Sequence, residues 1–442
     1  MRDQIRIEGP IVYNKRVLSF NLVFSPKVGR FFSSNRLVVE YPEDIDCVDK
    51  SVLRIPGLAS LVTLAWCLGA DVYIESMDKS FLDCLKIVKS VMKKWYPHLS
   101  FSTKIVTDPK TNSYKSNRFG LLFSGGLDST SSYIKYRKKD LILISVSGKG
   151  TSIDKQLQDE KLLTPVYDKE EKLFLIKTNV EQVINERLVY EKFGLNWWMN
   201  LSHGIVLSGH CAPLTVVENV GSIILASSFT REFNYPWGSH PLIDNNLYWG
   251  NTRVVHDGFD TTRQEKIKHI IKEYVMETGK YPRLKVCSKY QLAGINCGKC
   301  EKCSRTIVGL LAEGIDPNKF GFKINSNTLS NIKKVLEAGG FFGRKGLSER
   351  PAKLVNRLYP IFEWEDIQQH LPKTLDHDLF GSEEFFGWFR DFDIRKKAEQ
   401  IKASQIPKLL IYSYFDFLAP VSILLPKKMQ SLLRRSFEVF FD

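Results

Sequence analysis

The sequence predicts an α/β fold built on a doubly wound parallel sheet. Short apolar runs alternate with helical patterns through the middle of the chain, and this alternation is typical of parallel sheets. The predicted strands are residues 119–123, 141–147, 172–178 and 222–228. A glycine-rich turn, SGGLDST at 124–130, follows the first strand directly. Ligands of such sheets bind beyond the carboxyl ends of the strands, so this turn predicts the ligand site.

Residues 1–112 are predicted to form an appended N-terminal α+β domain. Alternating apolar segments within residues 1–46 predict a small β element. Residues 57–72 and 79–95 predict helices, and the second has an apolar stripe at helical spacing. A polar loop at 108–117 is expected to separate this domain from the strand that precedes the glycine-rich turn.

Residues 113–325 are predicted to form the nucleotide-binding domain. The helices expected there are 127–135, 180–192, 198–220 and 263–278. Because the carboxyl ends of parallel strands share one edge, Ser124, Ser147 and Ser227 are expected on the same rim.

The segment 230–266 is predicted to be a long loop that holds an acceptor molecule. Long loops without clear secondary structure are often functional. This one supplies charged residues, among them Arg231, Asp244 and Lys266, and an aromatic ring at Trp237. Such a mixture of charged and aromatic side chains suits a planar polar substrate. We therefore expect Arg231 and Lys266 to take part in catalysis.

Residues 326–442 are predicted to be a basic, helical region that serves packing or partner binding. Its most apolar stretch, 409–426, contains Asp416 and Pro420, which disfavours a membrane span. Contact of this C-terminal tail with a membrane surface stays open, and we favour a buried helix pair.

The composition indicates a folded, basic protein. The 442 residues are 43% apolar, and Lys and Arg exceed Asp and Glu by 63 − 49 = 14. Such a surface suits nucleic acid, an acidic protein or anionic lipid, but it is also typical of an ordinary solvated surface. No RNA-binding motif accompanies the charge, so tRNA is an alternative partner rather than the favoured one. The N-terminal residues do not resemble a signal peptide.

The SGGLDST turn carries the chemistry of a phosphate site. Gly125 and Gly126 let the backbone approach a phosphate closely, and the helix that follows presents free N–H groups. Hydroxyl donors flank them at Ser124, Ser129 and Thr130. Asp128 would repel a phosphate unless a cation lies between them, so we expect Mg²⁺ there. The turn is neither a Walker motif nor a GxGxxG turn.

Four cysteines predict a metal site. Cys287, Cys297, Cys300 and Cys303 have the spacing C-x9-C-x2-C-x2-C, which suits a closed tetrahedral Zn²⁺ site. An iron–sulfur cluster or a redox site is the alternative. The remaining cysteines are scattered: Cys47, Cys67, Cys84 and Cys211. Four cysteines are clustered with the spacing of metal ligands and the other four are isolated. This pattern favours a reducing, cytoplasmic location.

SGGLDST resembles the PP-loop of the N-type ATP pyrophosphatases. Those enzymes have an adenine nucleotide alpha hydrolase-like fold, split ATP between the α and β phosphates, and place AMP on a substrate oxygen. The resemblance implies ATP binding by Ser124, Gly125, Gly126, Leu127, Asp128, Ser129 and Thr130.

The PP-loop, followed by a helix and the four cysteines, resembles the 7-cyano-7-deazaguanine synthases of queuosine biosynthesis over residues 118–315. In that family ATP activates the carboxylate of 7-carboxy-7-deazaguanine, ammonia displaces AMP, and a second ATP drives the amide to a nitrile. A four-cysteine Zn²⁺ site lies beside the active site. The resemblance therefore implies ATP, Mg²⁺ and Zn²⁺ as cofactors and a heterocyclic carboxylate as substrate.

The chain departs from that family at several positions. Arg305 stands two residues after Cys303, where the family usually has an arginine three residues after its last cysteine. The family's Asp-Cys-Arg segment is absent, and SHPLID at 239–244 occupies the comparable stretch. With its extra terminal regions, the chain resembles long variants that accompany bacterial antiviral defence systems. Such variants imply a protein partner or acceptor.

The expected function is that of an ATP-dependent carbon–nitrogen ligase. A carboxylate is adenylated and passed to a nitrogen nucleophile, with Asp128, Ser129, Lys266 and Arg231 as catalytic residues. Two other functions remain alternatives. One is a tRNA-modifying PP-loop enzyme of the thiolation or lysidine type, and the other is a nucleotide-binding interaction subunit of a multi-protein system.

Overall fold

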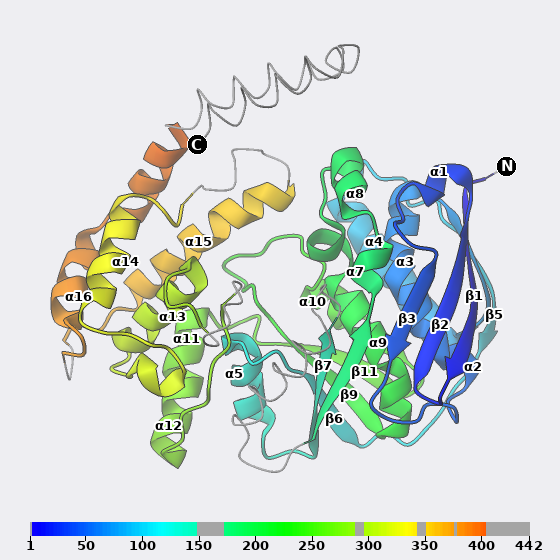
Figure 1. The fold of residues 1–442 in the computed structure, drawn as a ribbon, viewed down its shortest axis with the longest axis horizontal. Coiled ribbons are helices and arrows are strands. Elements are labelled where there is room, and N and C mark those ends of the chain that lie inside the picture. The colour runs from blue at the N-terminus through cyan, green and yellow to red at the C-terminus, as the bar shows by residue number, and fades with distance from the viewer. Residues whose placement is uncertain (1, 148–171, 288–295, 343–350, 375–377, 404–442) are drawn as a thin grey trace.

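An eleven-stranded sheet runs through the described part of the chain, in the order β10-β11-β9-β6-β7-β8-β3-β2-β1-β4-β5 (Figure 1). The computed structural model describes residues 2–147, 172–287, 296–342, 351–374 and 378–403. The strands are β1 (Gln4–Tyr13), β2 (Val17–Phe24), β3 (Arg36–Glu40), β4 (Asp71–Asp78), β5 (Ile105–Lys110), β6 (Arg118–Leu122), β7 (Leu141–Ser147), β8 (Leu173–Thr178), β9 (Val220–Ala226), β10 (Tyr248–Trp249) and β11 (Thr252–Asp257).

Helices connect and cover these strands. They are α1 (Pro26–Gly29), α2 (Lys50–Leu53), α3 (Ile55–Leu68), α4 (Lys79–Trp95), α5 (Leu127–Tyr136), α7 (Val180–Val183), α8 (Glu186–Phe193), η2 (Trp197–Ser202), α9 (His203–Val217), α10 (Pro241–Asp244), α11 (Arg263–Lys266), η3 (Ile267–Ile271), α12 (Lys272–Thr278), α13 (Glu301–Ala312), η4 (Pro317–Phe320), α14 (Asn327–Glu337), α15 (Pro351–Gln369) and α16 (Ser382–Asp391).

The central strands form a parallel sheet with a reversal of strand order. β8, β7, β6, β9 and β11 are neighbours in that order, and each adjacent pair is parallel. Numbered along the chain, these strands follow the order 3-2-1-4-5, so the order reverses between β6 and β9. This arrangement confirms the predicted α/β class with a large, mostly parallel sheet, and it is compatible with a doubly wound fold.

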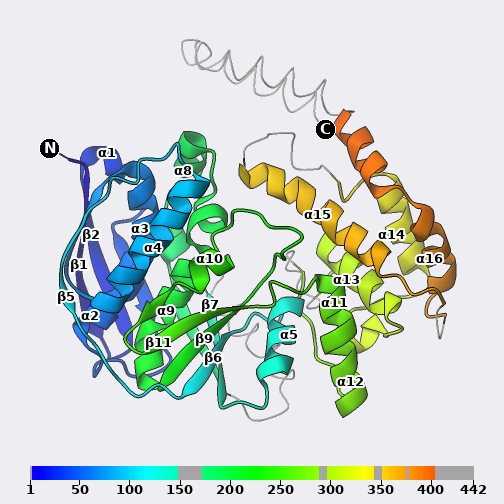
Figure 2. The same ribbon diagram turned by 180° about the vertical axis from the view of Figure 1, so that it is seen from behind.

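Helices cover both faces of this parallel region. Leu121 and Leu122 are adjacent in β6, yet their side chains belong to two different apolar cores because successive strand residues point to opposite faces. α3, α4 and α9 pack against one face, which Figure 2 shows from their side. α5 packs against the other face together with η3. The buried apolar runs of the central strands are therefore explained by burial on both faces.

The N-terminal strands continue the same sheet. β3 pairs with β8 in the antiparallel sense, through Val39 opposite Thr178 and Glu40 opposite Lys177. One apolar core also extends across both parts of the sheet. The expected boundary at residue 112 thus falls inside a continuous sheet, between β5 and β6, and the division of the chain into domains stays a prediction.

Several predicted elements need correction near the N-terminus and in the central loop. The helix expected at 57–72 ends at Leu68, because Gly69 adopts a left-handed conformation with φ of 68° and terminates it. The next residues form β4, and the expected polar linker begins inside β5. The loop expected at 230–266 contains β11. Two adjacent valines at the centre of β11 are too short an apolar run to predict a strand from the sequence. The strand forms because this segment pairs with β9.

The helix expected at 180–192 is broken into α7 and α8, because the backbone of Ile184 between them is extended. The other helix predictions are confirmed within small shifts. α4 has the expected bounds, and the Asp78 side chain caps it by accepting a 2.9 Å hydrogen bond from the Phe81 amide. The helix expected at 263–278 is formed by α11, η3 and α12 together. The helix expected at 198–220 corresponds to η2 and α9.

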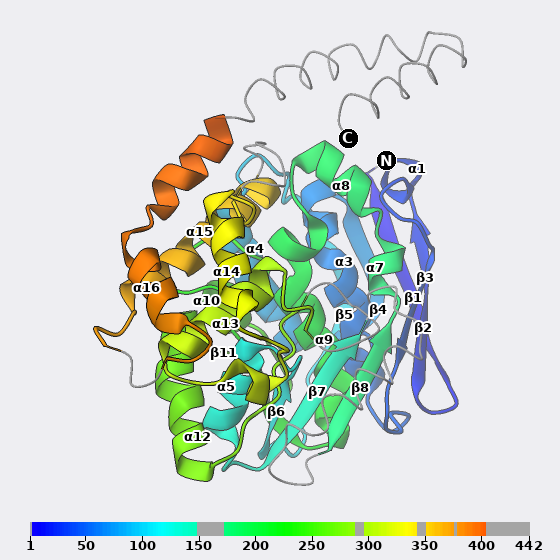
Figure 3. The same ribbon diagram turned by 60° about the vertical axis from the view of Figure 1, so that its left-hand side comes forward.

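The helices from α13 onward pack beside the parallel part of the sheet. α13, α14, α15 and α16 share a second apolar core with α5, and Figure 3 shows these four helices together. Within the described residues, no helix is long and apolar enough to cross a membrane. The stretch 409–426 lies outside the described residues.

Candidate functional site

The SGGLDST turn lies at the point where the strand order reverses. β6 ends at Leu122, and Gly125 turns the chain with a φ of 72°, a left-handed conformation that favours glycine. Gly126 then precedes the first residue of α5, and no side chain caps that helix end. The first N–H groups of α5 have no partner within the helix, so they are available to an anion at this edge.

Hydrogen bonds of its own serine hydroxyl groups stabilise the turn. Ser129 is buried, and its Oγ lies 3.2 Å from the Oγ of Ser124 and donates to the Gly126 carbonyl oxygen at 3.2 Å. The Ser124 hydroxyl accepts a 3.4 Å hydrogen bond from the Gly126 amide. The Thr130 hydroxyl is buried, without a hydrogen-bond partner among the described residues. The predicted site residues from 124 to 130 therefore form one compact turn.

Two cations hold the carboxylate of Asp128. Arg263 donates from Nη2 to Asp128 Oδ2 at 2.7 Å, and Lys266 donates from Nζ to Asp128 Oδ1 at 3.0 Å. Burial alone would raise the pKa of Asp128, but the two cations outweigh it and keep the pKa below its ordinary value. Asp128 is thus the anionic centre of a buried cluster at the rim.

This pairing bears on the expected Mg²⁺ ion. We expected a metal on Asp128 because its charge would otherwise repel a phosphate. Arg263 and Lys266 supply that compensation, and both carboxylate oxygens already accept hydrogen bonds from them. Asp128 therefore does not fit the expected role of a Mg²⁺ ligand in this arrangement, and we derive no step through that ion.

A small cavity opens at the same rim. It has a volume of about 170 Å³ and lies between the glycine-rich turn, the carboxyl ends of β6, β7 and β9, and the first turns of α9. Ser124, Asp128, Ser129 and His203 line it. Most ligand pockets measure roughly 300–1,000 Å³, so a whole nucleotide must extend beyond this cavity.

The two predicted catalytic cations of the 230–266 segment lie in different environments. Lys266 is buried beside Asp128 and also donates to the Ser227 carbonyl oxygen at 2.8 Å, so it belongs to the rim. The side chain of Arg231 is 71% exposed and forms an ion pair with Asp260. The structure therefore brings Lys266, but not Arg231, to the glycine-rich turn.

The C-terminal helix α15 also reaches this site, which the sequence did not indicate. Glu363 lies 3.2 Å from Arg263 and 3.4 Å from Arg305, and all three side chains are buried or nearly so. The Tyr359 hydroxyl donates a 2.5 Å hydrogen bond to the carbonyl oxygen of Ser228, which lines the cavity. In the sequence, Glu363 cannot be distinguished from the carboxylates that an amphipathic helix usually exposes to solvent.

Aromatic side chains gather beside the same edge. Phe229 contacts Phe233, Trp237 and Tyr359, with ring centroids 5.3, 4.8 and 4.7 Å apart. Phe233 and Trp237 come from the predicted acceptor segment, Phe229 directly precedes it, and Tyr359 comes from α15. Trp237, expected as an aromatic face for the acceptor, therefore lies in an aromatic cluster next to the cavity residue Ser228.

The four clustered cysteines form a candidate metal centre. Their sulfur atoms all lie within 4.8 Å of one another. Cys287 and Cys300 are 3.8 Å apart, Cys297 and Cys303 3.9 Å, and Cys300 and Cys303 3.4 Å. Zn–S bonds of about 2.3 Å in a tetrahedron place the sulfurs about 3.8 Å apart. The cluster can therefore bind a metal ion such as zinc, as predicted.

Asn296 organises the cluster, and the sequence prediction missed it. Its Oδ1 accepts hydrogen bonds from the amides of Val286, at 3.0 Å, and Cys287, at 3.3 Å. Its Nδ2 donates to the Leu284 carbonyl oxygen at 2.7 Å. The side chain thereby fixes the backbone of the first cysteine beside the other three. An asparagine directly before a Cys-x2-Cys motif is the signal that could have indicated this role.

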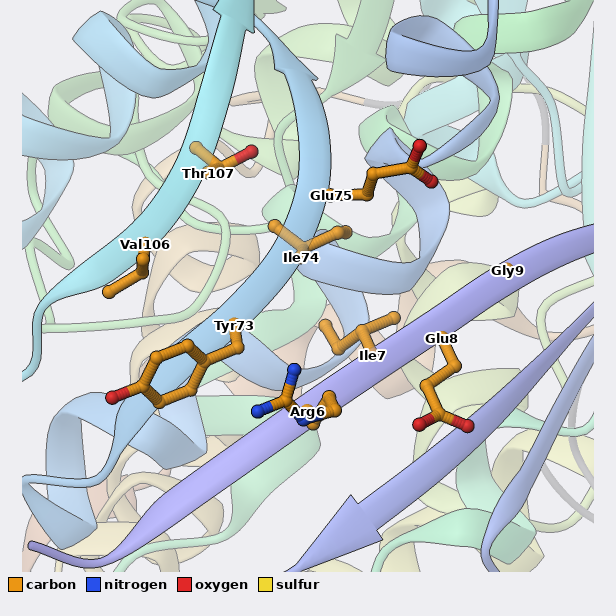
Figure 4. A pocket seen from close by; sticks show the side chains of 9 residues that line it. All are labelled: Arg6, Ile7, Glu8, Gly9, Tyr73, Ile74, Glu75, Val106 and Thr107. Atoms are coloured by element: carbon orange, nitrogen blue, oxygen red, sulfur yellow. The ribbon is translucent and has the colours of Figure 1, made fainter.

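A separate hollow lies at the far end of the sheet. It measures about 550 Å³ and is formed by β1, β4 and β5, with Arg6, Glu8, Tyr73 and Glu75 along it (Figure 4). The Arg6 guanidinium lies over the Tyr73 ring, 5.2 Å from its centroid. None of the residues lining this hollow belongs to the glycine-rich turn, so it is not part of the candidate site.

Comparison with known proteins does not assign the chain to a family. No protein-family model, curated protein or solved structure matches it. The candidate site therefore rests on the sequence motif and on the geometry described above.

Proposed function

We propose that this protein is an ATP pyrophosphatase of the PP-loop type that adenylates a carboxylate. The observation that carries the proposal is the position of the SGGLDST turn, at the reversal of strand order and at the start of α5. Helix N-terminal amides favour phosphate there. Arg263 and Lys266 add positive charge at the same rim.

In the proposed reaction, a substrate carboxylate oxygen attacks the α-phosphorus of ATP. The bond from that phosphorus to the bridging oxygen of the β-phosphate breaks, and pyrophosphate leaves with the bridging oxygen. A nitrogen nucleophile then attacks the acyl carbon of the adenylate, loses a proton to solvent, and displaces AMP. The chain contributes positioning and charge stabilisation rather than a covalent step.

The structure supports distinct roles for the rim residues in this reaction. The free amides at the start of α5 would hold the departing pyrophosphate, and Ser129 would keep the turn in shape. Asp128 would position Arg263 and Lys266, since it contacts both. We therefore describe Asp128 as a positioning residue rather than as a metal anchor.

We propose a planar heterocyclic carboxylate, similar to 7-carboxy-7-deazaguanine, as the substrate class. The resemblance of the two motifs suggests it, and the aromatic cluster of Phe229, Phe233, Trp237 and Tyr359 offers ring faces beside the rim. The nitrogen nucleophile would be ammonia or an amine of a partner protein.

Product analysis tests this function. Purified protein is incubated with ATP, 7-carboxy-7-deazaguanine and ammonium, and nucleotides and phosphates are quantified. We expect AMP and pyrophosphate in equal amounts, and a strong loss with S129A. The matched control is S131A, because Ser131 is buried in the same helix and its hydroxyl donates to the Leu127 carbonyl oxygen within that helix rather than to the Ser124 and Gly126 groups. Release of ADP and orthophosphate would contradict the proposal, and no product with this acceptor would contradict the substrate class.

A further inference from the structure

A second cavity lies beside the cysteine cluster, and Cys297 is among the residues that line it. Its volume is about 410 Å³, within the usual range for small-molecule sites. The start of α13, the segment 323–325 and one face of α14 form its walls, and Figure 3 shows these two helices near one another. No residue that lines it also lines the cavity at the glycine-rich turn.

The charge of this cavity is positive. Lys299 and Lys323 line it, and none of the described residues that line it is an aspartate or a glutamate. In the part of the chain that the structure describes, neither ammonium group forms an ion pair or a hydrogen bond with another side chain. Two uncompensated cations around one cavity favour an anionic ligand.

Polar donors reinforce that preference. Ser304, in the first turns of α13, is 1% exposed and lines the wall, and its hydroxyl has no hydrogen-bond partner among the described residues. Thr328, the second residue of α14, also lines the cavity, but its hydroxyl is engaged by Asn325, whose amide donates to it at 3.0 Å. The first amides of α14 are already paired, because the Asn325 side chain accepts a 3.0 Å hydrogen bond from the Asn327 amide and the Asn325 carbonyl oxygen accepts one from the Thr328 amide. The donors left for a ligand are therefore the Ser304 hydroxyl and the two lysines.

The floor of the cavity is apolar and includes an aromatic ring. Ile332 and Val335 come from one face of α14, and Phe341 follows that helix. The Phe341 ring is stacked on Trp364, with centroids 5.6 Å apart and planes 7° apart. This stacking holds the ring in place, and such a floor suits a flat ring of a ligand.

We propose that this cavity binds a small anionic ligand with a flat ring, of the size and chemistry of a nucleoside monophosphate. Lys299 and Lys323 bind the anionic group, and Phe341 with Ile332 contacts the ring. This site is additional to the proposed ATP site and does not depend on it, because the two cavities share no residue.

Photo-crosslinking with 8-azido-AMP tests the proposal on the full-length, metal-loaded chain. After irradiation, the labelled peptides are identified by mass spectrometry. We expect label within residues 323–341 that AMP suppresses, while inorganic phosphate and adenosine compete at least about tenfold more weakly. Equal competition by phosphate would overturn the role of the ring. Label confined to residues 124–130, or absent from 323–341, would overturn the site.

Charge reversal at Lys323 provides a second test of the proposed site. We expect K323E to weaken AMP competition at 323–341 by roughly tenfold or more, because a charge-assisted contact is replaced by repulsion. The matched control is K334E, an exposed lysine of α14 that does not line the cavity. K323Q serves if K323E loses metal or thermal stability. Equal effects of the substitutions at the two lysines would overturn the proposal.

Discussion

The backbone amide of Lys285 donates a 2.7 Å hydrogen bond to the carbonyl oxygen of Gly125. Lys285 lies two residues before Cys287, so a short stretch of backbone joins the candidate metal centre to the glycine-rich turn. Gly125 is also the residue whose left-handed conformation shapes that turn. A metal bound by the four cysteines would therefore stabilise the proposed ATP site as well as its own loop.

Metal loss is expected to loosen the glycine-rich turn. C300S removes one of the four thiols, so we expect lower metal content, a lower unfolding temperature and faster amide hydrogen exchange at 124–130. Metal analysis and exchange mass spectrometry measure these effects. The control is C47S, since Cys47 is exposed and outside the cluster. Unchanged exchange at 124–130 after metal loss would show that the two sites are independent.

Gly125 is expected to be needed for both stability and ATP use. Its φ of 72° costs an L-residue roughly 1 kcal/mol, so G125A should lower the free energy of unfolding by about that amount. Gly279 has a similar φ of 69° and open space around it, which makes G279A a control for the same strain. We expect both variants to lose similar stability in urea unfolding, but only G125A to lose ATP turnover. Equal turnover in the two variants would argue against the loop as the ATP site.

The carboxylate of Asp128 is expected to contribute far more to the free energy of unfolding than an exposed carboxylate does. D128N leaves Arg263 and Lys266 buried without their shared anion, which typically costs 3–5 kcal/mol. D83N is the comparison, because Asp83 pairs with Lys79 and Lys86 at the surface, where ion pairs contribute about 1 kcal/mol or less. Urea unfolding of both variants measures the difference. A small change in the free energy of unfolding for D128N would show that Asp128 does not neutralise the charges of Arg263 and Lys266.

Acid is expected to destabilise the protein through His210. This side chain lies buried in α9, where Nδ1 donates to the Val206 carbonyl oxygen at 2.8 Å and Nε2 accepts from Thr178 Oγ1 at 3.2 Å. Burial lowers its pKa from 6.5 to about 4. The unfolded chain therefore binds a proton first, and stability that is complete above about pH 6.5 is lost as the pH falls toward 4.

The size of this effect can be measured by substitution. From pH 7 to pH 5, the loss attributable to His210 is about 2 kcal/mol. H210N keeps a donor for the Val206 carbonyl oxygen and does not titrate, so its urea unfolding should show a pH dependence smaller by that amount. The same pH dependence in both proteins would show that His210 is not the group responsible.

The sequence allowed the parallel part of the sheet, the glycine-rich turn and the cysteine cluster to be predicted. Each has a strong local signal: continuous apolar runs, two glycines between a strand and a helix, and short cysteine spacings. Elements that depend on distant partners could not be predicted in this way. β11 has a weak local pattern and is determined by pairing with β9, and β3 joins the two parts of the sheet through β8.

The same distinction separates the site residues. Lys266 and Trp237 can be predicted because the 230–266 segment follows a strand of the sheet, but nothing in the sequence separates buried Lys266 from exposed Arg231. Glu363 acts over a separation of 100 residues from Arg263, and only the folded arrangement brings the two together. The sequence therefore could not show that protein cations compensate the charge of Asp128, and it led us to expect a metal ion there instead.

Amide hydrogen exchange with and without ATP tests whether residues 124–130 bind the phosphates of ATP. We expect slower exchange of the amides from Gly125 to Ser129 when ATP is added, because these N–H groups would donate to phosphate oxygens. The protection should be lost in G125A and retained in G279A. ATP binding that leaves these amides unprotected, or no ATP binding at all, would contradict the account.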